Sequence, residues 1–300
     1  MQEFKSGFVS IIGRTNVGKS TLINSLVGEK VAITTCKSQT TRTAIRAIVN
    51  RENSQIIFID TPGIHKPKTK LGNTMLETTW GTIPNVDITL FLIDASEDKI
   101  GKGDKIILDK IKETRKKTIL LINKIDLIKK EKILKIIEMY KNEYDFLEII
   151  PVSAEKQKNT EELLNSIEKY LPEGPMYYDV DEYTDQTARQ LVEETIREKA
   201  LKLLDEEVPH GIYVEVEKMN LRKTSKGEEI YDTEAIIYTL RNSHKGIIIV
   251  KNGEMLKRIA SYARQDLEKM LQTKLNLKVC VIVKENWQDN NSIVKKFENK

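Results

Sequence analysis

The stretch Gly13-Arg14-Thr15-Asn16-Val17-Gly18-Lys19-Ser20 decides the fold class of this chain. It fits the pattern G-x-x-x-x-G-K-[ST], follows an apolar run at 8–12 that is typical of a buried strand, and precedes a helical pattern. In that setting the glycines let successive backbone N–H groups face phosphate oxygens, Lys19 reaches the β- and γ-phosphates, and the Ser20 hydroxyl ligates Mg²⁺. A plain glycine turn is the alternative, and the strand–loop–helix context favours a phosphate-binding P-loop.

The first half of the chain alternates strand-like and helix-like patterns. Further strands are expected near 44–49, 55–59, 88–93, 118–122 and 147–151, and further helices near 103–116, 131–144 and 160–171. Residues 50–53 indicate the tight turn of one antiparallel hairpin. The alternation predicts a doubly wound, mostly parallel α/β sheet covered by helices on both faces.

A second phosphate-side motif, Asp60-Thr61-Pro62-Gly63, lies where the strand at 55–59 ends. The carboxyl ends of parallel strands form the edge at which α/β proteins bind ligands. There Asp60 can hold Mg²⁺ through water, and Gly63 can donate its backbone N–H to a γ-phosphate. Alone, the four residues would be an ordinary β-turn, but their place downstream of a P-loop favours the functional interpretation.

The segment Asn123-Lys124-Ile125-Asp126 follows the strand at 118–122. The Asp126 carboxylate can accept hydrogen bonds from N1–H and the 2-amino group of guanine, and adenine offers no such pair of donors. Ser153-Ala154, just after the strand at 147–151, places a backbone N–H near guanine O6. A chance strand-to-helix turn is the alternative.

Together these motifs resemble the translation-factor-related class of P-loop GTPases. Between the first two motifs, Gln39-Thr40-Thr41-Arg42 resembles the first switch of that class, in which the threonine before the arginine closes onto Mg²⁺ and the γ-phosphate. We assign this role to Thr41 first and to Thr40 second. The resemblance implies GTP or GDP as ligand and Mg²⁺ held by Ser20, Thr41 and Asp60. The residues expected to contact nucleotide are Gly13, Arg14, Thr15, Asn16, Val17, Gly18, Lys19, Ser20, Thr21, Asp60, Thr61, Pro62, Gly63, Ile64, Asn123, Lys124, Ile125, Asp126, Ser153 and Ala154.

The residue after Asp-Thr-Pro-Gly shapes the expected mechanism. Many GTPases carry a water-orienting glutamine there, whereas this chain has Ile64, which cannot orient water by hydrogen bonding. The neighbouring His65 is an alternative, although a lone histidine in a loop is more often solvated. Relatives with an apolar residue at this place are described as using K⁺, with the P-loop asparagine, here Asn16, as ligand. We therefore expect slow, potassium-stimulated hydrolysis in which Lys19, Thr41 and Asn16 are catalytic.

The length of 300 residues predicts two domains. Pro172-Glu173-Gly174-Pro175 breaks the last helix of the first half. We therefore place the GTPase domain at 1–172, a linker at 173–186 and a second domain, with a C-terminal tail, at 187–300. Its pattern of a helix near 192–203, strands near 212–218 and 230–240, a helix near 256–270 and a strand near 277–284 predicts a small α+β domain.

Charge is distributed unevenly within the second half. The formal net charge of +4 is too small to indicate a nucleic-acid partner. Residues 241–284, however, hold 10 basic and 3 acidic side chains, whereas residues 175–240 hold 8 and 16. The basic segment is the electrostatic pattern that phosphodiester backbones require, with a solvated helix face as the alternative.

The order of elements in this half resembles a KH domain of the bacterial type (type II), which clamps single-stranded RNA with a G-x-x-G loop between two helices. Residues 245–259 align with that region, and Val250 stands where the first loop glycine belongs. A β-branched residue resists positive φ, so we expect an altered or weaker grip on RNA. The expected RNA contacts are Lys245, Lys251, Asn252, Gly253, Lys257 and Arg258.

A GTPase with this switch joined to a KH-like domain resembles the Era family of bacterial GTPases over nearly the whole chain. The resemblance implies binding to the 3′ end of small-subunit ribosomal RNA, a role in small ribosomal subunit assembly, and peripheral association with the cytoplasmic face of the membrane. We expect a cytoplasmic location, because the sequence shows neither a signal peptide nor a membrane span. We also expect a monomer that binds no DNA. Two alternatives stay open: a metabolic P-loop kinase, and a passive RNA-binding or RNA-chaperone protein with a vestigial nucleotide site.

Overall fold

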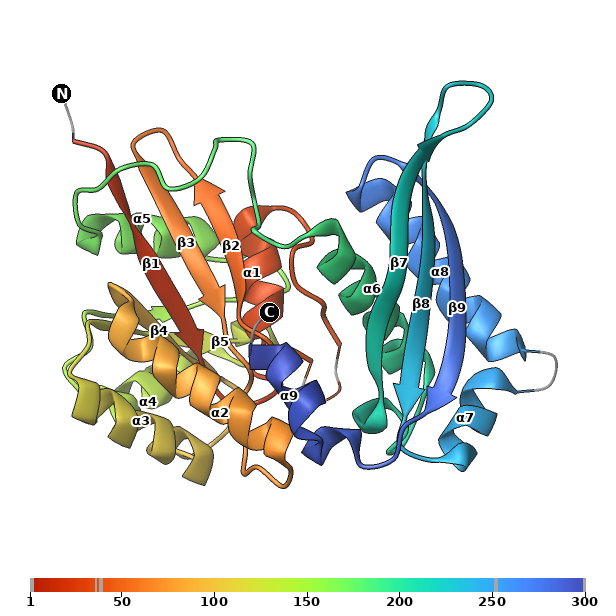
Figure 1. Cartoon of the computed structure of the whole chain (residues 1–300). Helices are drawn as coiled ribbons and strands as arrows, with labels where there is room; N and C mark the ends of the chain where they lie inside the picture. Colours follow the sequence, from red (N-terminus) through yellow and green to blue (C-terminus); the bar gives the residue numbers. More distant parts are fainter. Residues whose placement is uncertain (1–2, 36, 38–39, 251–252, 299–300) are drawn as a thin grey trace. The chain divides into compact units, whose positions relative to one another are not determined.

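The computed structural model describes residues 3–35, 37, 40–250 and 253–298 (Figure 1). The chain divides into two compact units, one formed by residues 1–185 with 296–300 and the other by residues 186–295. Most of the expected linker therefore groups with the first unit. No helix within the described ranges has the length and apolar character needed to cross a bilayer.

A six-stranded sheet forms the centre of the first unit, with the strand order β2-β3-β1-β4-β5-β6. Its strands are β1 (Lys5–Ile12), β2 (Ile45–Asn50), β3 (Ser54–Asp60), β4 (Ile88–Asp94), β5 (Thr118–Asn123) and β6 (Glu148–Pro151). Every neighbouring pair is parallel except β2 and β3, which form an antiparallel hairpin. The doubly wound, mostly parallel sheet expected from the sequence is confirmed.

Helices cover both faces of this sheet. They are α1 (Lys19–Val27), α2 (Lys70–Thr82), α3 (Lys102–Thr114), α4 (Lys130–Tyr140) and α5 (Thr160–Tyr170). Successive strand residues face opposite sides, so Leu90 and Leu92 join the apolar cluster under α1 and α5, whereas Phe91 and Ile93 join the cluster under α3 and α4. Helix α2, on the same side as α3 and α4, is an element that the sequence pattern did not predict.

The parallel arrangement brings the chemical motifs to one edge. The P-loop follows the end of β1, Asp60 is the last residue of β3, and Asn123 is the last residue of β5. Because these strands run the same way, their carboxyl ends meet at the same edge of the sheet. The topology alone therefore collects the phosphate-side and base-side motifs into one site.

Residues 173–178 contact the starts of β1 and β3, and residues 180–185 follow the free edge of β2, which explains why this segment belongs to the first unit. The backbone N–H of Ile48 donates to the Tyr183 carbonyl at 3.0 Å. At the start of the same strand, Arg46 forms an ion pair of 2.8 Å with Asp185. The segment therefore pairs with an otherwise open sheet edge.

The second unit has the α+β arrangement expected from the sequence. Its elements are α6 (Ala188–Leu203), β7 (Tyr213–Lys223), β8 (Glu229–Thr239), α7 (Asn242–Ile249), α8 (Glu254–Met270) and β9 (Lys274–Val283). The strand order is β7-β8-β9, with β7 antiparallel and β9 parallel to β8. One apolar cluster joins the sheet to α6 and α8, and the C-terminal tail contains α9 (Asn291–Glu298).

Candidate nucleotide site and RNA-binding surface

The P-loop connects β1 to α1 and is shaped by close backbone contacts. Gly18 has φ 102°, and a Cβ atom there would lie 2.3 Å from Nδ2 of Asn123. Asn16 also adopts a positive φ, of 64°, while Val17 is buried in the apolar cluster. Only glycine at position 18 lets the loop approach Asn123 this closely.

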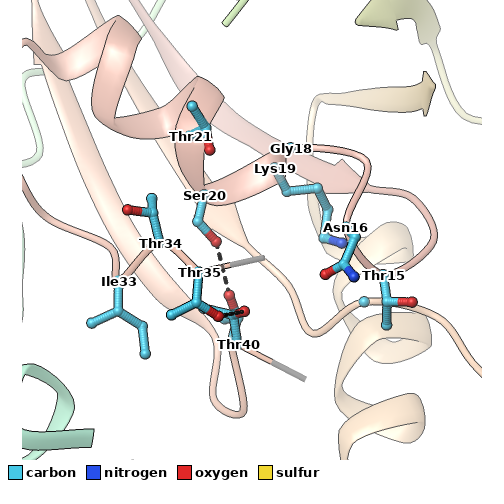
Figure 2. A pocket seen from close by; sticks show the side chains of 12 residues that line it. Thr15, Asn16, Gly18, Lys19, Ser20, Thr21, Ile33, Thr34, Thr35 and Thr40 are labelled. Atoms are coloured by element: carbon cyan, nitrogen blue, oxygen red, sulfur yellow. Dashed lines mark hydrogen bonds between the residues drawn. The ribbon is translucent and has the colours of Figure 1, made fainter. Parts of the chain in front are cut away.

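Lys19 is the buried cation of the loop. Its Nζ donates to the carbonyl oxygens of Gly13 at 3.2 Å and Arg14 at 3.0 Å. Figure 2 shows its side chain extending from α1 toward Asn16. Burial lowers the pKa of Lys19 to about 8, although the charge of Asp60 acts in the opposite direction. An anionic phosphate would give this desolvated ammonium a stronger partner than two neutral carbonyls.

Ser20, Thr41 and Asp60 form a triangle of oxygen atoms beside Lys19. The Ser20 and Thr41 hydroxyls lie 3.0 Å apart, and they donate to Oδ2 of Asp60 at 2.9 and 3.0 Å. Asp60 is fully buried, and its Oδ1 has no hydrogen-bond partner within the described part of the chain. Burial raises the pKa of Asp60, against the effect of Lys19 and the two hydroxyls. Two hydroxyls and a carboxylate with a spare buried oxygen fit a hard cation such as Mg²⁺.

The segment between α1 and β2 brings one of the two candidate threonines to this triangle. Thr41 is the buried one, whereas the Thr40 hydroxyl donates to the Lys37 carbonyl at 2.8 Å and lies 3.1 Å from that of Thr35. The same segment adds pocket residues that no motif indicated. They are Ile33, Thr34 and Thr35, which line the pocket together with Thr15, Gly18 and Thr21 (Figure 2).

Hydrogen bonds join the Asp-Thr-Pro-Gly turn, and the residue after it, to the end of β1 and to the P-loop. The Thr61 hydroxyl donates to the Ile11 carbonyl at 2.7 Å, and the backbone N–H of Ile64 donates to Gly13 at 3.1 Å. The Ile64 side chain is buried in the apolar cluster. Nδ1 of His65 lies 2.9 Å from the Gly63 carbonyl. Ile64 therefore contributes packing and a backbone bond, and offers no polar group to a water molecule.

The base-side motif is also joined to the P-loop. Asn123 donates to the Val17 carbonyl at 2.8 Å, and its Oδ1 accepts the backbone N–H of Ala154 at 3.0 Å. The Ser153 hydroxyl donates a 2.5 Å hydrogen bond to the exposed carboxylate of Asp126. The sequence placed a backbone N–H from Ser153-Ala154 near guanine O6, and in this structure the N–H of Ala154 is paired with Asn123. Ser153 also acts through its hydroxyl, which sequence reasoning missed.

Lys124 links the base side of the site to the loop. Its ammonium donates to the Asn16 carbonyl at 2.9 Å and forms a 2.6 Å ion pair with Asp94, the last residue of β4. Burial alone would raise the pKa of Asp94, but hydrogen bonds from Lys124 and Ser96 outweigh it and lower that pKa. Asp94 was not predicted, because a single acidic residue at a strand end carries no motif.

The candidate RNA surface lies around α7 and α8. Lys257 and Arg258 are exposed in the first turns of α8, Lys245 is half-buried on α7, and Gly253 caps α8 with φ 72°. No ion pair within the described residues involves Lys245, Lys257 or Arg258, whereas the more distant Lys274 is neutralised by Glu228 at 2.8 Å. Two other expected contacts, Lys251 and Asn252, lie outside the described residues.

Val250 occupies the position of the first loop glycine. It is exposed and adopts φ 50° and ψ −176°. That combination is essentially restricted to glycine. The backbone of this chain therefore takes a glycine-like conformation with a β-branched side chain in place.

Comparison with known proteins matches each of the two units to a known domain family. A family described as 50S ribosome-binding GTPase matches residues 8–124, and the KH domain family matches residues 207–288. GTPase Era of Clostridium kluyveri is 50% identical over 293 residues, which cover 98% of each chain. GTPase Era of Clostridium tetani is 51% identical over 295 residues, again 98% of each chain. The chain belongs to the Era family of GTPases.

Two solved Era structures extend this likeness to three dimensions. Era in complex with MgGDPNP and nucleotides 1506–1542 of 16S ribosomal RNA gives a TM-score of 0.93 at 39% identity, covering 98% of both chains. A tyrosine-to-alanine variant of Aquifex aeolicus Era bound to GDP·AlF4⁻ gives 0.92 at 38% identity, covering 98% of this chain and 99% of that one. The family and the fold class expected from the sequence, a P-loop GTPase domain followed by a KH domain, are confirmed.

Proposed function

We propose that this chain is a GTP-hydrolysing switch protein that binds the 3′ end of small-subunit ribosomal RNA and acts in assembly of the small ribosomal subunit. The observation that carries the proposal is the likeness, over 98% of the chain, to an Era that holds both MgGDPNP and a 16S ribosomal RNA segment. A cytoplasmic location follows from this RNA partner.

Each part of the nucleotide has a suitable partner in the site. The P-loop N–H groups and Lys19 bind the phosphates, and Ser20, Thr41 and Asp60 hold Mg²⁺, which neutralises phosphate charge when bound. Asp126, oriented by the Ser153 hydroxyl at 2.5 Å, reads the N1–H and 2-amino group of guanine. This set of contacts supports GTP as the ligand and accounts for both ends of the molecule.

Hydrolysis in this site depends on groups other than a glutamine. The buried Ile64 side chain offers no hydrogen bond to water, so Thr41 and backbone groups position the nucleophile. Asn16 would hold a K⁺ ion, which would supply positive charge beside the phosphates when bound. Replacement of K⁺ by Na⁺ tests this step directly. Slower turnover in Na⁺ supports it, and equal turnover contradicts it.

The switch follows from the contacts of Thr41. Its hydroxyl lies at the metal site, so the segment before β2 is held while the γ-phosphate and Mg²⁺ are present and is released after hydrolysis. The cations of the second unit, Lys245, Lys257 and Arg258, contact the RNA backbone. Peripheral membrane association and a monomeric state stay predictions from the family resemblance.

Crosslinking tests the function as a whole. The protein is crosslinked in cells with GTP analogue or GDP present, and the attached RNA and the crosslinked residues are both sequenced. Sites on the 3′ end of small-subunit ribosomal RNA that touch residues 245–258 support the proposal. Random RNA, or none, would overturn the RNA partner, and phosphate transfer to an acceptor other than water would revive the kinase alternative.

A further inference from the structure

Arg14, in the second position of the P-loop, directs its side chain away from the nucleotide pocket. Its Nε lies 2.9 Å from Oδ1 of Asp104, and its Nη2 lies 2.6 Å from Oε1 of Glu97. Asp104 belongs to the first turn of α3 and its side chain is 2% exposed. Arg14 is also absent from the residues that line the phosphate pocket. The guanidinium is thus a structural link from the loop to α3.

Neighbouring residues on α3 and α4 pack directly against the Arg14–Asp104 pair. A Cβ atom at Gly103 would lie 2.5 Å from Cδ of Arg14, so the absence of a side chain there makes room for the arginine. The pKa of the Tyr140 hydroxyl, at the end of α4, is raised by burial and by the Asp104 carboxylate, which lies close to it. Burial raises the pKa of Asp104, and the charge of Arg14 acts against this. Without Arg14, the Asp104 carboxylate would be a buried charge with no cation beside it.

The backbone of the same residue carries contacts that belong to the nucleotide site. The Arg14 carbonyl accepts a 3.0 Å hydrogen bond from Nζ of Lys19. The residue also forms a parallel bridge with Ile64, directly after the Asp-Thr-Pro-Gly turn. A Cβ atom at Gly63 would lie 2.9 Å from Cα of Thr15. A shift of Arg14 would therefore displace both the anchor of Lys19 and the turn that faces the γ-phosphate.

We propose that Arg14 is a positioning residue for GTP hydrolysis, which acts by fixing the P-loop backbone to α3 through Asp104. This inference rests on the proposed function and assigns to Arg14, which the sequence analysis expected to contact nucleotide, a side chain that pairs with Asp104 and Glu97 outside the phosphate pocket. The base-reading residues Asp126 and Ser153 lie on other loops. Loss of the Arg14–Asp104 link therefore impairs the phosphate end of the site and leaves recognition of guanine in place.

A pair of variants separates positioning from folding. Arg14→Met removes the guanidinium and leaves the buried Asp104 carboxylate without a cation, so both stability and turnover fall. In the double variant Arg14→Met/Asp104→Asn a neutral amide replaces the buried carboxylate, so no unpaired charge is left and the unfolding midpoint recovers. Arg14→Lys keeps a cation for Asp104 and restores part of the turnover. Lys110→Met, which breaks the exposed Lys110–Glu113 pair on the same helix, is the matched control.

The measurements are kcat and KM for GTP, the affinity for GDP, and the unfolding midpoint of each variant. We expect kcat to fall about 10- to 100-fold in Arg14→Met and to stay low in the double variant. A loss of this size is expected when catalytic groups are misplaced by about 1 Å. KM and GDP affinity should change by a smaller factor than kcat, because the base-reading residues keep their contacts while the Lys19 anchor and the turn facing the γ-phosphate shift. Recovery of kcat together with the midpoint in the double variant, or full kcat in Arg14→Met, would overturn the inference alone. Absence of hydrolysis by the unchanged protein would overturn the proposed function and this inference with it.

Discussion

The hydroxyl of Thr41 donates a 3.0 Å hydrogen bond to Oδ2 of Asp60. One residue comes from the segment between α1 and β2 and the other from the end of β3, so the bond joins two parts of the site that have different roles. Because Ser20 contacts both residues, three oxygens already lie together where a cation is needed. The neighbouring Thr40 instead contacts Lys37 and Thr35 within its own segment.

Replacing Thr41 with alanine should therefore slow hydrolysis without abolishing nucleotide binding. We expect kcat for GTP to fall about 100-fold, the usual cost of losing one group that stabilises a transition state. GDP affinity should change little, because GDP lacks the γ-phosphate that this segment senses. Thr40→Ala is the matched control and should stay close to the unchanged protein in a phosphate-release assay. A larger loss in Thr40→Ala than in Thr41→Ala would reverse the assignment.

The hydrogen bond from Ser153 to Asp126 predicts two graded effects on base recognition. Ser153→Ala keeps the Asp126 carboxylate but removes the hydroxyl that orients it. The loss of this hydrogen bond, worth about 1 kcal/mol, should weaken GDP binding about fivefold. Asp126→Asn exchanges an acceptor for a donor and should shift preference from guanine toward xanthine nucleotides. Titrations with GDP and XDP measure both. Unchanged preference for guanine in Asp126→Asn would remove the base-reading role of that residue.

Lys19 predicts a link between nucleotide binding and proton uptake. Its pKa is lowered to about 8 in the free protein because the ammonium is buried, and a bound anionic phosphate raises it again. Above pH 8 the free protein therefore holds a neutral amine and the complex a charged one. Binding then takes up a proton, and affinity falls by about tenfold per pH unit.

Calorimetric titration with GDP at pH 9, in buffers of different ionisation enthalpy, measures that proton. At pH 7 the ammonium is about nine-tenths charged in the free protein, so Lys19 takes up only about 0.1 proton and the same protein serves as its own control. Heats that do not depend on the buffer at pH 9 would show that the amine stays charged in the free site.

Replacing Val250 with glycine should raise both the stability of the protein and its affinity for RNA. A β-branched residue at φ 50° and ψ −176° is strained, and Val250→Gly should raise the free energy of unfolding by about 1–2 kcal/mol. Removing the side chain also lets an RNA backbone approach more closely, so affinity for single-stranded RNA should rise. Val250→Ala keeps the Cβ atom and should gain less in both measurements. A Val250→Gly protein that is less stable than the original would mean that the side chain contributes packing which outweighs the strain.

Much of the site could be predicted because its motifs lie at strand ends. Asp60 and Asn123 follow apolar runs that are unambiguous strands, and parallel pairing then brings their ends together. The side-chain partners could not be predicted in the same way. Asp94 and Asp104 are single acidic residues whose importance comes from Lys124 and Arg14, distant in sequence.

Two features of the backbone, helix α2 and the extended segment 173–185, could not be predicted from the sequence pattern either. The residues of α2 include several threonines and glycines, which are poor helix formers, and the helix is stabilised by its Thr69 cap and by burial of Leu71 and Met75. Residues 173–185 lack periodicity because they bind as an extended segment. Both the N–H and the carbonyl of Tyr178, for example, pair with the side chain of Gln55.

A GTP switch that acts through RNA implies that the nucleotide state changes RNA affinity, and one titration tests this implication most directly. The full-length protein, loaded with Mg²⁺ and a non-hydrolysable GTP analogue, with GDP, or with no nucleotide, is titrated against a fluorescent RNA of the small-subunit 3′ end, with a scrambled RNA alongside. We predict at least about fivefold tighter binding of the 3′-end RNA in the GTP-analogue state, an ordinary size for coupling between two sites. Equal affinity in all three states would contradict the account and favour a passive RNA-binding protein.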